Sequence, residues 1–435
     1  MNIEELHKIY LSCTTVTTDS RNCPEGSMFF ALKGESFNGN RYAGKALEAG
    51  AKYAVVDEKD AKNGSDNIIL VNDVLKTLQE LAAYHREWLG IPIIAITGTN
   101  GKTTTKELTR EVLKQKFNVK ATEGNYNNHI GVPLTLLSFT KETEFGVVEM
   151  GANHPGEIGF LCNIAKPDFG LITNIGKAHL EGFGSIEGVM KTKGELYDYL
   201  SKNAGTIFVN KDNPYLNKML PEDADTVFYG TSSNDGLVQG ETAGKDFFLK
   251  LKWKNNITGK KHELMTNLIG DYNLENVLAA VTTGCYFNVD EKNINNAIKE
   301  YIPSNNRSQY LQTDKNEILL DAYNANPSSM QKALENFKKI DGSNKALILG
   351  SMKELGADSE QEHRELIKKI KELNADKVFL VGNEFSPDLS LIPEALFFNG
   401  VEELAGYLDE HTLSGYKILV KGSRSNKLEK IITYL

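Results

Sequence analysis

Long hydrophobic runs are missing from this sequence, and cysteines are few. None of its 435 residues belongs to a stretch that approaches the roughly 18 consecutive apolar residues of a membrane span, so we expect a soluble protein without a membrane partner. Its four cysteines, Cys13, Cys23, Cys162 and Cys285, have neither C-x-x-C spacing nor the density of a disulfide framework. They fit small buried side chains in a reducing cytoplasm, and we interpret none as a metal ligand.

A signal peptide and an excess of basic charge are also missing. The opening "MNIEELHKIYLSC" has acidic residues where a signal peptide is positive, and no apolar segment follows, so we expect a cytoplasmic location. The 58 acidic and 49 basic residues give a net charge of -9. That charge argues against wide contact with the phosphates of nucleic acid and favours small-molecule partners. We expect a monomer.

Short apolar runs alternate with helical stretches, as they do in parallel α/β proteins. At roughly 150 residues per domain, the length predicts about three domains. We place them at residues 1–88, 89–303 and 304–435. Strands are expected at 27–34, 51–58 and 67–73, at 91–97, 145–150, 169–176 and 206–210, and at 345–350, 377–382 and 417–422. Near 249–253 apolar residues alternate with lysines before an Asn-Asn turn, which predicts an antiparallel hairpin.

The stretch "ITGTNGKTTT" at 96–105 ends like a phosphate-binding loop but lacks that loop's first glycine. The pattern G-x-x-x-x-G-K-[ST] would place glycine where this chain has Ile96. An apolar strand precedes the loop and a helix follows, so free backbone N–H groups face an anion at the helix N-terminus. Lys102 can reach the outer phosphates and Thr103 can ligate magnesium. The alternative is a plain strand-to-helix turn.

Two further side chains follow neighbouring strands on the edge where open α/β sheets bind ligands. Glu149 closes an apolar strand, and His179 follows the next one. Magnesium needs oxygen ligands besides Thr103, and a carboxylate at a strand end is the usual one. Taken singly, Glu149 and His179 are also compatible with structural roles.

Several motifs, in this order and spacing, resemble the Mur ligases, the ATP-dependent amide-forming enzymes of peptidoglycan precursor synthesis. They are "GTNGKTTT", "EGNYNNHIGVPLTLL", "EMGANHPGEI", "NIGKAHLEGFGS" and "KTKGEL". The resemblance, which runs from about residue 18 to 424, implies three domains. A small N-terminal α/β domain would bind the UDP-sugar, and a central domain with a P-loop-type, mostly parallel sheet would bind ATP. A Rossmann-like C-terminal domain would bind the incoming dipeptide.

Within this family, "TDSR", "FFALKGESFNG", "DAYNANPSSM" and "SMKELG" resemble the members that add D-alanyl-D-alanine to UDP-N-acetylmuramoyl-tripeptide. The resemblance therefore implies an acyl-phosphate mechanism that yields ADP and phosphate, and a role in cell wall synthesis, cell shape and division. Two alternatives remain: a relative that adds the third residue of the stem peptide, or a nucleotide switch without ligase activity. Whether the tripeptide ends in lysine or diaminopimelate stays open.

The resemblance also implies roles for individual residues. Catalytic roles fall to Lys102, His179, Lys193 and Arg307. ATP would contact Gly98, Thr99, Asn100, Gly101, Lys102, Thr103, Thr104, Asn273, Asn276, Arg307, Asp321 and Asn324. The other substrates would contact Ser20, Arg21, Asn125, Asn127, Asn128, Tyr323 and Asn326. Two magnesium ions would be held by Thr103, Glu149, His179 and a carbamylated Lys193.

Three positions depart from the pattern that the family usually shows. Asn38-Gly39-Asn40 replaces Asp-Gly-His, which makes the contacts of that loop uncertain. "NKDN" at 210–213 leaves Asp212 without a firm role, and Tyr272 stands where histidine is frequent.

Overall fold

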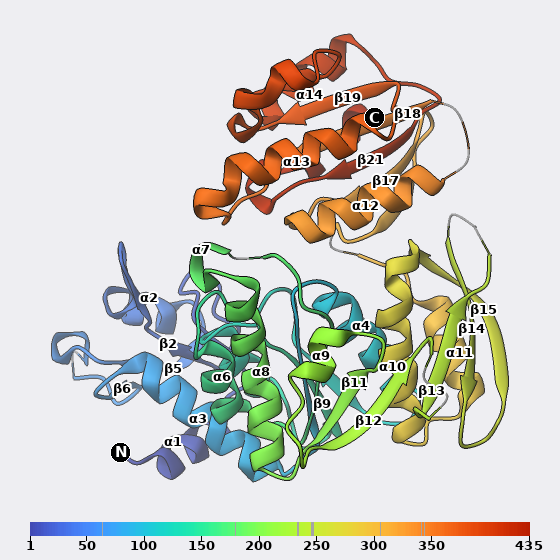
Figure 1. Ribbon diagram of the computed structural model, residues 1–435. Coiled ribbons are helices and arrows are strands. Elements are labelled where there is room, and N and C mark those ends of the chain that lie inside the picture. Colours follow the sequence, from blue (N-terminus) through green and yellow to red (C-terminus); the bar gives the residue numbers. More distant parts are fainter. Residues whose placement is uncertain are drawn as a thin grey trace.

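The structure is a computed structural model that describes residues 1–435 except 63, 179, 233–234, 245–247, 305, 341 and 343. Its strands form three main sheets, each built from one stretch of the chain, and a short two-stranded ribbon (Figure 1). This arrangement confirms the predicted α/β class with a mostly parallel central sheet. No helix in the described part of the chain is long and apolar enough to cross a membrane.

The first sheet is parallel and has the order β1-β2-β5-β6. Its strands are β1 (Val16–Thr17), β2 (Ser27–Phe30), β5 (Ala51–Val56) and β6 (Ile68–Leu70), beside the ribbon β3 (Lys33–Gly34) and β4 (Phe37–Asn38). The helices are α1 (Ile3–Tyr10), η1 (Gly39–Tyr42), α2 (Ala43–Glu48), η2 (Lys59–Lys62) and α3 (Val74–Leu89). Asp73 caps α3 by accepting a hydrogen bond from the Lys76 backbone N–H, and Gly90 ends the helix in the left-handed conformation.

The central sheet has nine strands in the order β15-β14-β13-β12-β11-β10-β7-β9-β8. They are β7 (Ile93–Thr97), β8 (Val119–Ala121), β9 (Phe145–Glu149), β10 (Phe169–Ile172), β11 (Thr206–Asn210), β12 (Asp225–Gly230), β13 (Val238–Thr242), β14 (Phe248–Asn255) and β15 (Lys261–Ile269). All neighbours pair in parallel except β13–β14 and β14–β15. Strands β7 and β9 are buried along their whole length, as the continuous apolar runs predicted.

Helices cover both faces of this sheet. They are α4 (Lys102–Leu113), α5 (Gly131–Leu136), α6 (Glu157–Ala165), α7 (Leu180–Phe183), α8 (Ile186–Lys202), α9 (Pro214–Lys218), η3 (Asp271–Asn273), α10 (Leu274–Tyr286) and α11 (Glu291–Glu300). One apolar cluster joins α4 and α10 to the sheet, and another joins α6 and α8 to α3 of the first region. Because β7 lies between β9 and β10, the loops after these three strands converge at one edge.

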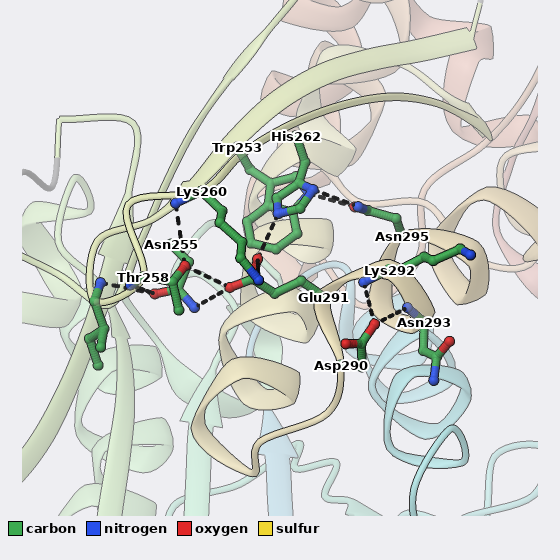
Figure 2. Close-up of polar contacts among 11 residues, drawn as sticks. Trp253, Asn255, Thr258, Lys260, His262, Asp290, Glu291, Lys292, Asn293 and Asn295 are labelled. Carbon is green, nitrogen blue, oxygen red and sulfur yellow. Dashed lines mark hydrogen bonds and ion pairs between the residues drawn. The ribbon is translucent and has the colours of Figure 1, made fainter.

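The predicted hairpin is confirmed as β14 and β15, with Leu249, Leu251 and Trp253 buried. Figure 2 shows how α11 holds it: Glu291 accepts hydrogen bonds from Asn255 Nδ2 and Thr258 Oγ1, both at 2.8 Å. His262 stacks on Trp253 and lies 2.9 Å from Glu291 through Nε2. These side chains tie the antiparallel edge to a helix, away from the converging loops.

The third sheet has the order β16-β17-β21-β18-β19-β20, and only β16 runs antiparallel to its neighbour. Its strands are β16 (Gln309–Gln312), β17 (Glu317–Asp321), β18 (Lys345–Gly350), β19 (Lys377–Val381), β20 (Leu396–Phe398) and β21 (Lys417–Lys421). The helices are α12 (Pro327–Lys339), η4 (Gly356–Asp358), α13 (Ser359–Lys371), η5 (Asn383–Leu391), α14 (Val401–Glu410), η6 (Arg424–Asn426) and η7 (Leu428–Tyr434).

In Figure 1 this third region, in orange and red, lies above the other two, with α12 facing the central sheet. Polar contacts join the two parts: the Asn326 amide donates to Asn100 Oδ1 at 2.9 Å, and Lys177 pairs with Glu362 at 2.7 Å. A second ion pair joins Lys339 to Asp271 at 2.8 Å. The converging loops of the central sheet are therefore covered by the third region.

Candidate active site

A cavity of about 720 Å³ lies where the loops after β7 and β9 face the third sheet. We call it the central cavity. It brings together most of the residues that the sequence predicted for ligand binding. Those that line it are Thr99, Asn100, Gly101, Lys102, Thr104, Asn125, Asn127, Asn128, Glu149, Asn273, Asn276, Arg307, Asp321, Tyr323, Asn324 and Asn326.

The predicted phosphate loop turns sharply from β7 into α4 because two glycines have positive φ. Gly98 has φ +138°, and a Cβ added there would lie 2.1 Å from Thr173 Oγ1. Gly101 has φ +78°, and a Cβ there would meet Asn276 Oδ1 at 2.5 Å. Only glycine fits either position without displacing a neighbour. Asn174 supports the loop, since its Oδ1 accepts from the Asn100 backbone N–H at 3.0 Å.

Lys102 starts α4 and curls back over its own loop. Its Nζ donates to the carbonyl oxygens of Gly98 at 2.8 Å and Thr99 at 3.2 Å. Burial lowers the pKa of Lys102, and the positive charge of Arg307 lowers it further, while Glu149 acts in the opposite direction. An anion in this loop would offer Lys102 a partner of opposite charge in place of two neutral carbonyls.

Thr103, on α4, and Glu149, at the end of β9, bring the oxygen atoms of a hydroxyl and a carboxylate together. Thr103 Oγ1 donates to Glu149 Oε2 at 2.9 Å, and Asn127 Nδ2 donates to Oε1 at 2.8 Å. Glu149 is 1% exposed, so its carboxylate is held in a fixed orientation inside the protein. A hydroxyl and a carboxylate beside a phosphate loop are the donors that magnesium prefers, so these residues fit that ion. No group of three or more His, Cys, Asp or Glu that could hold a metal occurs among the described residues.

Lys193 lies on α8, next to the cavity wall but not in its lining. The side chain is buried, and its Nζ is 3.5 Å from the Ala152 carbonyl oxygen and 5.4 Å from the centre of the Phe183 ring. Burial, with repulsion from Lys102, lowers the pKa of Lys193 to about 7. His179, the other predicted ligand of a second metal, lies outside the described residues.

Asn273 and Asn276 lie side by side at the start of α10, beneath the phosphate loop. Asn276 Nδ2 donates to Asn273 Oδ1 at 2.9 Å, and Asn276 Oδ1 accepts from Thr105 Oγ1 at 3.1 Å. Both amides therefore also tie α10 to α4, besides lining the cavity. Tyr272, where the family often has histidine, contacts Ser308 of the third region through its hydroxyl at 2.9 Å.

The third region contributes Arg307 and the segment after β17. The carboxylate of Asp321 pairs with the buried Lys421 and accepts from the Ser308 N–H at 3.2 Å. Asn326 caps α12 by accepting from the Ser329 N–H at 2.8 Å. These residues therefore reach the cavity from a distant part of the chain.

Two predicted residues lie elsewhere. Neither Ser20 nor Arg21 belongs to the lining described for the central cavity, and Arg21 is exposed and pairs with Asp19 at 2.9 Å. The loop with the unusual Asn40 is well ordered by contacts: Asn40 Oδ1 accepts from the Asp57 N–H at 3.0 Å, and its Nδ2 donates to Asp57 Oδ1 at 2.8 Å. Asp212 caps the turn at Thr231 through backbone and side-chain hydrogen bonds.

Several polar residues of this site were not predicted from the sequence, and three of them show why. Lys332 and Lys421 line the cavity from the third region, and Asn174 supports the phosphate loop. Asn174 follows β10 within "TNIG", so its position at a strand end was an available signal. Lys421 begins the "KGSR" segment at 421–424. Lys332 gave no signal, because it resembles any lysine on an amphipathic helix.

Comparison with known proteins gives a consistent result along the chain. Three family descriptions match: "Mur ligase family, catalytic domain" at residues 12–86, "Mur ligase middle domain" at 96–284 and "Mur ligase, glutamate ligase domain" at 306–424. The chain is 34% identical to the "UDP-N-acetylmuramoyl-tripeptide--D-alanyl-D-alanine ligase" of Bacillus subtilis (strain 168), over 96% of this chain and 92% of that protein.

Solved structures agree. The fold is similar to that of MurF from Acinetobacter baumannii, with a TM-score of 0.87 and 28% identity over 99% of this chain and 98% of that one. It is also similar to the MurF ligase of Thermotoga maritima in complex with ADP, with a TM-score of 0.84 and 28% identity over 98% and 97% of the two chains. This chain therefore belongs to the Mur ligase family.

Proposed function

We propose that this chain is an ATP-dependent ligase that joins D-alanyl-D-alanine to UDP-N-acetylmuramoyl-tripeptide. One observation carries the proposal: a single cavity unites the phosphate loop, Glu149 and the 321–326 segment of the third region. Relatives named for this reaction match nearly the whole length of the chain. The product would serve peptidoglycan synthesis, and through it cell shape and division, in the cytoplasm.

The chemistry explains why such a cavity is needed. A carboxylate does not react with an amine at neutral pH unless it is activated. The terminal carboxylate of the tripeptide attacks the γ-phosphorus of ATP, the bond to ADP breaks, and an acyl phosphate forms. The amine of the dipeptide then displaces phosphate and forms the amide bond. The protein's task is to position the three substrates and to offset their negative charge.

Named residues can perform that task. Lys102 and Arg307 face the cavity from opposite regions and would contact the ATP phosphates, together with backbone N–H groups of the loop at 98–104. Asn273 and Asn276 would lie near the adenine. Asn125, Asn127 and Asn128 would line the path of the muramoyl peptide. Ser20 and Arg21, on the first sheet's side, would contact the uridine diphosphate.

We assign the three parts of the chain accordingly: residues 1–88 to the UDP-sugar, 89–303 to ATP and 304–435 to the dipeptide. Thr103 and Glu149 would hold one magnesium ion, and His179 and Lys193 would contribute to a second. The ions would offset charge where a carboxylate meets a triphosphate. Lys193 would help to hold the second ion as a carbamate, since a free ammonium beside two cations would repel them.

The deciding experiment is a phosphate-release assay with ATP, magnesium and UDP-N-acetylmuramoyl-tripeptide, in which only the acceptor is varied. We expect release with D-alanyl-D-alanine, none with a diamino acid, and complete loss when a chelator removes magnesium. A tripeptide ending in lysine and one ending in diaminopimelate are tested in parallel to identify the third residue. Release with UDP-N-acetylmuramoyl-dipeptide and a diamino acid would instead identify a ligase for the third stem residue.

A further inference from the structure

Arg307 occupies an unusual turn of the backbone. Its two neighbours, Asn306 and Ser308, have φ values of +57° and +45°, in the left-handed region that residues other than glycine rarely adopt. Such conformations persist only where surrounding contacts hold them. Here the Tyr323 N–H donates to the Asn306 carbonyl at 3.2 Å, and the Ser308 N–H donates to Asp321 Oδ1 at 3.2 Å. The turn is thus held from both sides by the segment after β17.

The same segment also contacts the Arg307 side chain. The Arg307 guanidinium carbon lies 3.7 Å from the centre of the Tyr323 ring, which is close contact of a cation with an aromatic face. Arg307 Nε is buried and has no hydrogen-bond partner among the described residues. Arg424 lies farther from the same ring, with its guanidinium carbon 5.6 Å from the ring centre. The ring is therefore the close partner of the Arg307 cation in a cavity that also contains Lys102 and the carboxylates of Glu149 and Asp321.

We propose that Tyr323 is a positioning residue whose ring face holds the Arg307 guanidinium at the central cavity, ready for the nucleotide phosphates. The inference rests on the proposed function, in which Arg307 contacts the phosphates of ATP. Tyr323 would thus support ATP binding by positioning Arg307, and its hydroxyl would not bind the dipeptide. Without the ring, Arg307 would lose this close contact while Lys102 still lies in the same cavity, and it would spend more time away from the cavity.

The test compares Tyr323→Phe, which keeps the ring, with Tyr323→Leu, which removes it. We expect Tyr323→Leu to lower kcat/KM for ATP and to weaken ADP binding by about tenfold each, which is the size of a partly buried cation–aromatic contact. Tyr323→Phe should stay within about twofold of the unmodified enzyme, because the ring face is retained. The KM for D-alanyl-D-alanine should not change in either variant. ADP binding is measured by calorimetry, and thermal unfolding verifies that each variant folds.

A double-mutant cycle separates this inference from the proposed function. In an Arg307→Ala background, Tyr323→Leu should add less than about a twofold loss, because the ring acts through the arginine. Fully additive losses, or a higher KM for the dipeptide in Tyr323→Phe, would overturn the positioning role while leaving the ligase intact. If Arg307→Ala itself kept normal kcat and ADP affinity, the role of Arg307 in the proposed function would be wrong instead.

Discussion

At the scale of single residues, two cations of the central cavity have uncharged groups as their close partners, which leaves them available to bind a polyphosphate. Lys102 is bound to two carbonyl oxygens, and Arg307 lies on an aromatic ring. Lys421, in contrast, already pairs with Asp321. Neither Lys102 nor Arg307 forms an ion pair within the described part of the chain, although the chain as a whole is acidic, with a net charge of -9. The overall charge therefore gives no indication of the local one.

Lys193 gives the residue-scale prediction. If its carbamate helps to hold a metal ion that offsets charge in the transition state, Lys193→Ala should lower ligation about 100-fold or more. Added formate or acetate should restore part of the activity by filling the same place. Lys191→Ala is the matched control, because Lys191 lies on the same helix and is exposed. Normal turnover by Lys193→Ala, or no rescue, would contradict the carbamate.

The residues that the sequence pattern itself identified, apart from the family resemblance, are those whose position depends on their immediate neighbours in the chain. Gly98, Gly101 and Lys102 were recognisable because strand, turn and helix follow one another within a few residues. Lys332 was not, because nothing in an amphipathic helix indicates which lysine faces a cavity formed by another part of the chain. The motif alone assigned Tyr323 to substrate binding. Its contact with Arg307 depends on two residues in the left-handed backbone conformation, which no sequence pattern predicted.

At the scale of elements, buried strands were predicted more reliably than edge strands. The apolar runs at β7, β9, β10 and β11 are fully or almost fully buried, so their composition follows from their place in the sheet. Several strands were not predicted, among them β1, β8, β12, β13, β16 and β20. β1 has two residues and β8 has three, one of them the exposed Lys120, and both lie at the edge of a sheet. Segments this short carry no measurable period.

The contact between α1 and α3 leads to a prediction on pH. His7 Nε2 lies 3.0 Å from His85 Nδ1, and His85 Nε2 lies 2.9 Å from the Phe139 carbonyl oxygen. Because that carbonyl only accepts, His85 donates from Nε2 and accepts from His7 Nε2 through Nδ1, which requires a neutral His85 ring. Burial, with repulsion from His85, lowers the pKa of His7 to about 4, and burial lowers the pKa of His85.

Both pKa values are below the unfolded value of about 6.5, so this contribution to stability is complete above pH 6.5 and is lost as the pH falls towards 4. Each histidine should lower the free energy of unfolding by up to about 1.4 kcal/mol per pH unit in that window. Urea unfolding between pH 8 and pH 4 measures the slope. His7→Gln keeps a donor but does not titrate, so its slope should be smaller. Equal slopes would mean that His7 is charged or exposed in the folded protein.

At the scale of the whole molecule, the third region is fixed to the central one by contacts between residues far apart in sequence. Asn100 and Asn326 join the phosphate loop to the start of α12 across 226 positions, and the Lys177 N–H donates to Ser328 Oγ at 3.1 Å. A domain boundary between residues 303 and 304 was expected from the sequence, but the contacts between residues on either side of it were not. Such pairs depend on how two folded regions meet, which neither periodicity nor local motifs encode.

The last prediction uses the two functions of the Asn326 side chain. Its Oδ1 caps α12 through the Ser329 N–H, so its amide nitrogen is directed to Asn100 Oδ1 in the phosphate loop. Asn326→Ser should keep the helix cap, since serine accepts the same bond, but lose the link between the regions. Asn326→Ala should lose both, with about 1 kcal/mol lower stability.

A single hydrogen bond of about 1 kcal/mol changes an open–closed equilibrium roughly fivefold. Small-angle scattering should therefore find a larger radius of gyration for nucleotide-free Asn326→Ser than for the unmodified chain, and saturating ADP should remove most of the difference because it favours the closed form. Thermal unfolding should distinguish the alanine variant but not the serine variant. If both variants unfolded alike and scattered like the unmodified chain, the Asn100–Asn326 contact would follow closure without stabilising it.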